Sequence, residues 1–191
     1  MSTIEKPASQ PYALPKDRGV MDVWWPFGPA PAVSRWSIKI AAEQTEGRLL
    51  QILSRDGRGM APPLHIHHGA DETWYVLEGE LTIFVGDERI EAGPGDFVFG
   101  PMGVPHSFLV TSDWAEFLVT FSPAGTEGPM GSGVDGFFRE VAVPVVPGQA
   151  PPEPTEADPE EFTRRMAQYG IEVVGPPPVL GRATARSAAR T

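Results

Sequence analysis

The stretches GMAPPLHIHHGADETWYVLEG (residues 59–79) and GDFVFGPMGVPH (residues 95–106) contain all four histidines of the chain, three of which form a spaced group with a glutamate. His65 and His67 are separated by one residue, Glu72 follows after four more, and the second stretch ends at His106. Residues i and i+2 of a β-strand project from the same face, so His65 and His67 can point together into an interior. The small, polar interval before Glu72 favours a chain reversal that brings Glu72 back beside them.

His106 follows the turn GPMGVP (residues 100–105), and we expect it to complete the group from across the rolled sheet. Three imidazoles and one carboxylate suit one divalent transition metal ion, with Fe, Mn, Ni, Co, Cu and Zn all open, and are too rich in nitrogen for Ca or Mg. The alternative is that these histidines are unrelated to one another or exposed to solvent, and bind no metal. The combined spacing of both stretches favours His65, His67, Glu72 and His106 as metal ligands.

The sequence around these stretches predicts an all-β domain. Between residues 33 and 143 it breaks into short β-rich runs such as ELTIFVG (80–86) and HSFLVTS (106–112), the last of them being FFREVAV (137–143). Glycine- and proline-containing turns separate the runs, and the chain has 21 glycines and 22 prolines. Many short strands joined by such turns are typical of a jelly-roll β-barrel.

The flanking segments have a different character. Residues 1–32 are punctuated by proline and carry the aromatic cluster VWWPF (23–27), which predicts an extended arm packed on the barrel or on a second subunit, and hence a homodimer. Residues 144–175 predict a proline-rich linker and one short docking helix, with Asp158 as N-cap, Pro159 at the first helical position and Phe162, Met166 and Tyr169 as its apolar stripe. We expect residues 176–191 to be a disordered tail.

Charge and composition exclude several classes of function. The formal net charge is -10, which argues against nucleic acid as a partner. There is no cysteine, so thiolate ligands and disulfides are excluded. No apolar run has the length of a signal-peptide core or of a membrane span, so we expect no membrane association and a cytoplasmic location.

The two histidine-containing stretches resemble the paired motifs of the cupin superfamily over residues 59–106. The resemblance implies a jelly-roll barrel around one metal ion. A looser resemblance extends to bacterial single-domain cupins grouped with quercetin 2,3-dioxygenase. Those enzymes hold a divalent metal through three histidines and a glutamate and add both atoms of dioxygen to a flavonol, with release of carbon monoxide.

We therefore expect a metal-dependent dioxygenase for a small aromatic or enolisable, flavonol-like substrate, with dioxygen as second substrate. Glu72 would then be both ligand and catalytic proton acceptor. Two alternatives remain open on the same barrel. One is a non-redox isomerase, lyase or cyclase in which Glu72 moves protons, and the other is a small-molecule-binding protein without turnover.

Strand alternation also gives candidates for a substrate pocket. Residues that share a face with Glu72 or with His106, or that lie close to His106 in the chain, should line it, although filling of the core is the plainer interpretation of the same pattern. The candidates are Trp74, Val76, Phe99, Met102, Phe108 and Val110. His68 falls on the opposite face and is expected at the surface.

Overall fold

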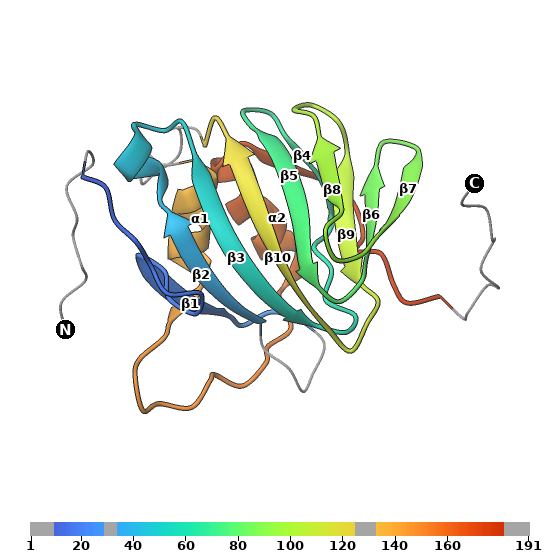
Figure 1. Ribbon diagram of the computed structural model, residues 1–191. Helices are drawn as coiled ribbons and strands as arrows, with labels where there is room; N and C mark the ends of the chain where they lie inside the picture. The colour runs from blue at the N-terminus through green and yellow to red at the C-terminus, as the bar shows by residue number, and fades with distance from the viewer. Residues whose placement is uncertain (1–9, 29–33, 125–132, 182–191) are drawn as a thin grey trace.

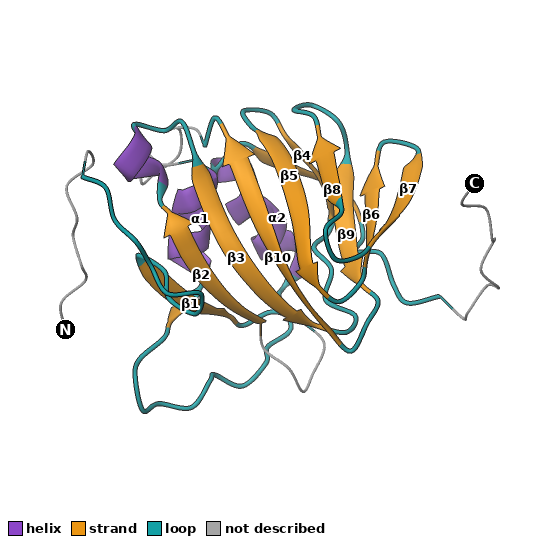
Figure 2. Ribbon diagram, in the orientation of Figure 1, coloured by secondary structure: helices purple, strands orange, loops and turns teal. Residues whose placement is uncertain are grey.

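The computed structural model describes residues 10–28, 34–124 and 133–181. The chain forms two antiparallel sheets that face each other, one of seven strands and one of five. Figure 2 shows that strands dominate and that helices are few. The predicted all-β jelly-roll is confirmed, although hydrogen bonding does not run from one sheet into the other around a closed cylinder.

The larger sheet forms one wall of the molecule, in the order β11-β1-β2-β3-β10-β5-β8. In that order its strands are Val143–Pro144, Met21–Trp25, Ser34–Ile40, Leu50–Gly57, Trp114–Ser122, Asp71–Glu78 and Phe97–Gly100. A short 3-10 helix, η1 (Ala42–Thr45), follows β2. The smaller sheet has the order β12-β4-β9-β6-β7. Its strands are Ile171–Gly175, Leu64–His67, His106–Val110, Leu81–Val85 and Glu88–Ala92.

The core lies between the sheets because apolar residues alternate along the strands. On β3, Leu50 and Ile52 point inward, and on β5 Trp74 and Val76 do the same, all with at most 3% of their surface exposed. Val119 on β10 is the cross-strand partner of Ile52 on β3 and of Trp74 on β5. One face of the large sheet is therefore apolar from strand to strand, and the smaller sheet packs against it.

The N-terminal arm is a strand of the large sheet over part of its length. Residues 21–25 form β1, which pairs with β2 on one side and with β11 on the other. Val23 and Trp25 alternate inward and are buried, which is the pattern of a half-buried strand. Trp25 stacks on Trp36 of the same chain with ring centroids 4.5 Å apart. The aromatic cluster of the arm is thus used within one chain.

The segment FFREVAV, predicted as a strand, is helical over most of its length, and that prediction is wrong. Helix α1 spans Val134–Val141 and precedes the two-residue strand β11. Val134, Phe137 and Val141 are buried, and their spacing of three and four residues puts them on one face of a helix. The doublet of Phe137 and Phe138 looks β-like in isolation, but the apolar period over the whole segment is helical.

The C-terminal helix occurs where the sequence predicts it. Helix α2 spans Pro159–Gln168, and the Asp158 side chain accepts hydrogen bonds from two backbone N–H groups of its first turn. Gly170 ends it with a left-handed φ of 71°. Both helices lie behind the large sheet (Figure 1).

Strand β12 then follows α2 and pairs with β4. The interval predicted as linker and helix therefore ends in a strand of the smaller sheet, which the sequence did not predict. Residues 182–191 of the predicted tail lie outside the described residues. No helix in the described ranges is long and apolar enough to cross a bilayer.

Candidate metal centre

Three strands from the two sheets bring the candidate ligands together. His65 and His67 lie on β4, and His106 opens β9, where it is the direct cross-strand partner of His65. Glu72 lies on β5 of the larger sheet, in register with Phe121 of β10. The expectation that His106 reaches across from the far side is therefore wrong: the three histidines share the smaller sheet, and Glu72 reaches them from the opposite one.

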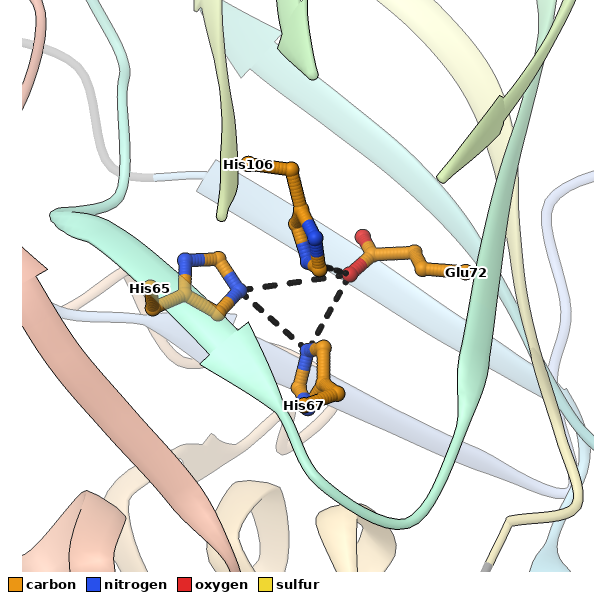
Figure 3. A group of neighbouring side chains, drawn as sticks. All are labelled: His65, His67, Glu72 and His106. Carbon is orange, nitrogen blue, oxygen red and sulfur yellow. Dashed lines mark hydrogen bonds and ion pairs between the residues drawn. The ribbon is translucent and has the colours of Figure 1, made fainter. Parts of the chain in front are cut away.

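The four side chains converge on one point (Figure 3). Glu72 Oε2 lies 3.1 Å from Nε2 of both His67 and His106 and 3.9 Å from Nε2 of His65. The Nε2 atoms of His65 and His67 are 3.2 Å apart. All four ligand atoms lie within 4.8 Å of one another, and all four residues are buried. Each side chain therefore offers one donor atom to the same small volume.

Backbone carbonyls orient two of the imidazoles. His65 Nδ1 lies 2.8 Å from the carbonyl oxygen of Pro63, and His106 Nδ1 lies 2.9 Å from that of Val104. A carbonyl can only accept, so each Nδ1 is a donor, and Nε2 is the ring nitrogen that faces the centre. His67 Nδ1 is buried without a partner in the described structure, and its ring packs edge-on to Phe121.

Electrostatics keep the group in a form that binds cations. Burial, and then the neighbouring His67 and His106, lower the pKa of His65 to about 3, so its imidazole is neutral. Burial alone would raise the pKa of Glu72, but hydrogen bonds from His106 and His67 outweigh it and hold the pKa well below its usual range. The carboxylate is thus ionised, and neither arginine nor lysine pairs with it in the described ranges.

The donor set fits a divalent transition metal ion. Ligands about 2.1 Å from a common ion lie at most about 4.2 Å apart, close to the observed spread. A buried carboxylate is unfavourable unless a cation compensates it, and no lysine or arginine pairs with Glu72 among the described residues. The arrangement therefore suits an ion that accepts nitrogen and oxygen donors together.

A cavity of about 940 Å³ opens beside this group. His65, His67 and Glu72 line it, whereas His106 is fully buried behind them. Much of the remaining lining is apolar and comes from six aromatic side chains that we call the aromatic wall. These are Trp25, Phe27, Trp36, Phe137, Phe138 and Phe162. A space of this volume accommodates a drug-sized ligand.

The residues expected to line the pocket divide into three groups. Phe108 lines the cavity. Trp74, Val76 and Val110 face inward but are fully buried in the core and do not reach the cavity. Trp74 packs against His106 with ring centroids 5.6 Å apart, so it supports a candidate ligand from behind.

Phe99 and Met102 lie at the surface, with 51% and 45% of their area exposed, and do not line the cavity. The reason is the strand register. Glu72 pairs with Gly100, so Gly100 shares the inner face, and its neighbour Phe99 points outward with Thr73. His68 is also at the surface, as predicted from alternation, and lies 2.7 Å from Glu172.

The aromatic wall was not predicted from the sequence as part of the site. Its rings come from the arm, from β2, from α1 and from α2, which are up to about 140 residues apart in the chain. The ring contacts between Trp25 and Phe162 and between Trp36 and Phe138 join these segments. The apolar stripe of α2 is the signal that was available, since Phe162 and Met166 both line the cavity.

Comparison with known proteins identifies the domain that carries the candidate ligands. Residues 55–121 match the cupin domain family. Quercetin 2,3-dioxygenase of Bacillus subtilis is 25% identical over 139 residues, which cover 73% of this chain and 39% of that protein. An uncharacterised protein of Streptomyces coelicolor is 39% identical over 56 residues, which cover 29% of this chain and 53% of that protein. The chain thus spans about half or less of the length of these curated relatives.

Among solved structures, a protein from Thermus thermophilus is 37% identical, with a TM-score of 0.39, over 40% of this chain and 74% of that one. The matched family segment contains His65, His67, Glu72 and His106, and the rest of the chain adds β1, β2, both helices and β12 around it. By this match and by its place in the two facing sheets, the segment of residues 55–121 is a cupin domain.

Proposed function

We propose that this cupin is a metal-dependent dioxygenase of the quercetinase-like type, acting on a small aromatic or enolisable substrate. The observation that carries the proposal is the position of the His65, His67, Glu72 and His106 group at the wall of a large apolar cavity. The distant similarity to a quercetin 2,3-dioxygenase supports it. A substrate can therefore reach the candidate ion through a space that suits aromatic rings.

The metal ion would be held by Nε2 of the three histidines and by Glu72 Oε2. When bound, it would supply Lewis-acid and redox chemistry at the cavity wall. The histidine contacts of Glu72 all go to Oε2, which leaves Oε1 without a partner in the described structure. We propose that Oε1 accepts the proton of the substrate hydroxyl, so that the enolate forms inside the cavity.

The aromatic wall contributes by excluding water. A low-dielectric surrounding strengthens the attraction between an enolate and a cation, and it protects a reactive carbanion from protonation by solvent. The apolar rings also gain free energy by covering the flat face of an aromatic substrate. The residues of the chain thus orient the substrate and hold its proton.

Oxygen uptake tests the proposal. Protein purified without oxygen and loaded separately with Fe, Mn, Co, Ni, Cu or Zn should consume dioxygen when a flavonol is added, with at least one of these ions. Uptake is measured with an oxygen electrode, and metal content by elemental analysis. If a fully loaded protein converts an enol without consuming oxygen, the non-redox isomerase, lyase or cyclase is the better assignment, because Glu72 Oε1 can move a proton without dioxygen. If it binds ligands and converts none, it is a binding protein.

The homodimer predicted from the N-terminal arm stays a prediction. Trp25 is buried within its own chain, so the arm no longer gives a reason to expect a second subunit. Light scattering on the purified chain measures the mass directly, and a mass of about 20.6 kDa would mean a monomer.

A further inference from the structure

A second polar group lies in the cavity wall, on the larger sheet. Ser54 of β3 lines the cavity, and its hydroxyl donates a hydrogen bond to Asp56 Oδ2 at 2.8 Å. The Trp36 indole N–H donates to Asp56 Oδ1 at 2.9 Å, and Ser34 also hydrogen-bonds this carboxyl. Asp56 is 1% exposed and has no cationic partner among the described residues. None of these residues belongs to the metal centre.

The hydrogen bonds of this group fix what Ser54 can offer to a ligand. Because its proton is engaged by Asp56, its oxygen presents only lone pairs to the cavity. The Trp36 N–H is likewise engaged, so that side chain presents its ring. A ligand atom beside Ser54 must therefore be a hydrogen-bond donor, such as a hydroxyl or an N–H group.

The strand register sets the distance between the two polar groups. Glu72 pairs with Phe121 and Phe121 with Leu50, so Leu50 marks the level of the metal centre on β3. Ser54 lies four residues further along β3, about 13 Å at the usual rise per residue. After allowance for side chains that reach into the cavity, the gap is on the order of 10 Å. A single aromatic ring is too short to span it.

The lining between the two groups is apolar. Ile52, Val119 and Phe108 lie along it, and the aromatic wall covers one side. No lysine or arginine lines the cavity in the described part of the chain. A second anionic group on the ligand, such as a carboxylate or phosphate remote from the ion, would be desolvated there without compensation.

From these observations we infer that Ser54 is a specificity-determining residue, which binds a hydroxyl or N–H donor at the end of an elongated, otherwise apolar and uncharged ligand whose other end lies at the metal centre. Ser34, Trp36 and Asp56 are positioning residues that fix the direction of the Ser54 hydroxyl. The inference rests on the proposed function only for the location of the reacting end.

Two flavonols test the inference: kaempferol, which carries a hydroxyl at the 4′ position remote from its enol, and galangin, which lacks it. Binding to the metal-loaded chain is measured under nitrogen by quenching of tryptophan fluorescence, because Trp25 and Trp36 line the cavity. The wild-type chain should bind kaempferol about fivefold more tightly, as expected for one neutral hydrogen bond. Ser54→Ala should bind the two flavonols about equally, while its affinity for galangin and its metal content stay as in the wild-type chain.

Ser37→Ala is the matched control. Ser37 is equally buried on the neighbouring strand β2, but its hydroxyl donates to Asp22 at 2.6 Å and does not line the cavity. The Ser37→Ala variant should still bind kaempferol about fivefold more tightly than galangin. A preference that survives in Ser54→Ala, or that is lost equally in Ser37→Ala, overturns the assignment. If Ser54→Ala does not fold, the wild-type chain alone decides, since equal affinity for the two flavonols, or binding of neither, also overturns it.

Oxygen uptake on the same samples separates this inference from the proposed function. A fivefold preference that depends on Ser54, without any oxygen uptake, supports the binding site and removes the dioxygenase. Oxygen uptake by a chain that binds both flavonols equally leaves the dioxygenase and removes the role of Ser54.

Discussion

The candidate metal centre and the aromatic wall face the same cavity but are built in opposite ways. The metal centre takes its four side chains from residues 65–106, within the matched family segment. The wall takes Trp25, Phe137 and Phe162 from segments outside it. Polar donors that must meet at one point leave a regular spacing in the sequence, whereas apolar rings need only to be near one another. The comparison suggests that the candidate metal centre determines which reaction is possible and that the aromatic wall determines which ligand fits.

The largest effect is expected from removal of a ligand. His65→Ala and His106→Ala should each lower bound metal from about one ion per chain to below about a tenth, and abolish activity, since loss of even an outer-shell partner costs 10- to 100-fold in affinity. Elemental analysis of the purified variants gives the metal content. His68→Ala is the control, because this exposed histidine bonds Glu172 and takes no part in the centre. Full metal content in both variants would contradict the site.

Loss of the proposed proton acceptor should affect turnover more than metal content. Glu72→Gln keeps an oxygen donor and the shape of the side chain, but it removes the basic carboxylate. We expect turnover to fall by about 100-fold or more, the usual contribution of a general base, while much of the metal is retained. Equal fractional losses of metal and of turnover would reduce Glu72 to a ligand.

Truncation within the aromatic wall should separate stability from metal binding. Trp25 is buried and contacts five other rings. Trp25→Ala should lower the free energy of unfolding by about 3–5 kcal/mol, as for other buried large aromatic residues, with the metal content per folded chain unchanged. Urea denaturation measures the free energy of unfolding. Trp114→Ala, at a half-exposed site, is the control and should cost far less. Parallel loss of metal would show that the two regions are not independent.

The smallest effect concerns the packing behind His106. A Cβ atom at Gly100 would lie 2.9 Å from Trp74 Cζ3, and Trp74 is the residue that packs on His106. Gly100→Ala should therefore cost about 1–3 kcal/mol of stability through overpacking and weaken metal binding through the displaced imidazole. Gly93→Ala is the control, because nothing lies within 4 Å of its added Cβ. If the two variants have the same melting temperature and metal affinity, Trp74 does not support the centre.

Local rules predicted what depends on neighbouring residues. The i, i+2 rule placed His65 and His67 on one face, and the capping pattern at Asp158 located the start of α2. The same rules did not place Phe99, because only the pairing of β8 with β5 reveals which of its residues face inward. The Phe137–Phe138 doublet was misread as a strand because the run was taken from Phe137 onward, and the helical spacing appears only when Val134 is included.

The pairing of β12 with β4 couples the far end of the chain to the strand that carries two of the candidate ligands. Ile171 lies opposite His67 and Val173 opposite His65. Trimming the protein to the matched family segment would remove one of the two neighbours of β4 and leave the amide and carbonyl groups on that side open to another molecule. Conversely, a C-terminal segment grafted from a relative would change the cavity lining at Ile171 and Val173 while the candidate ligands keep their own sequence.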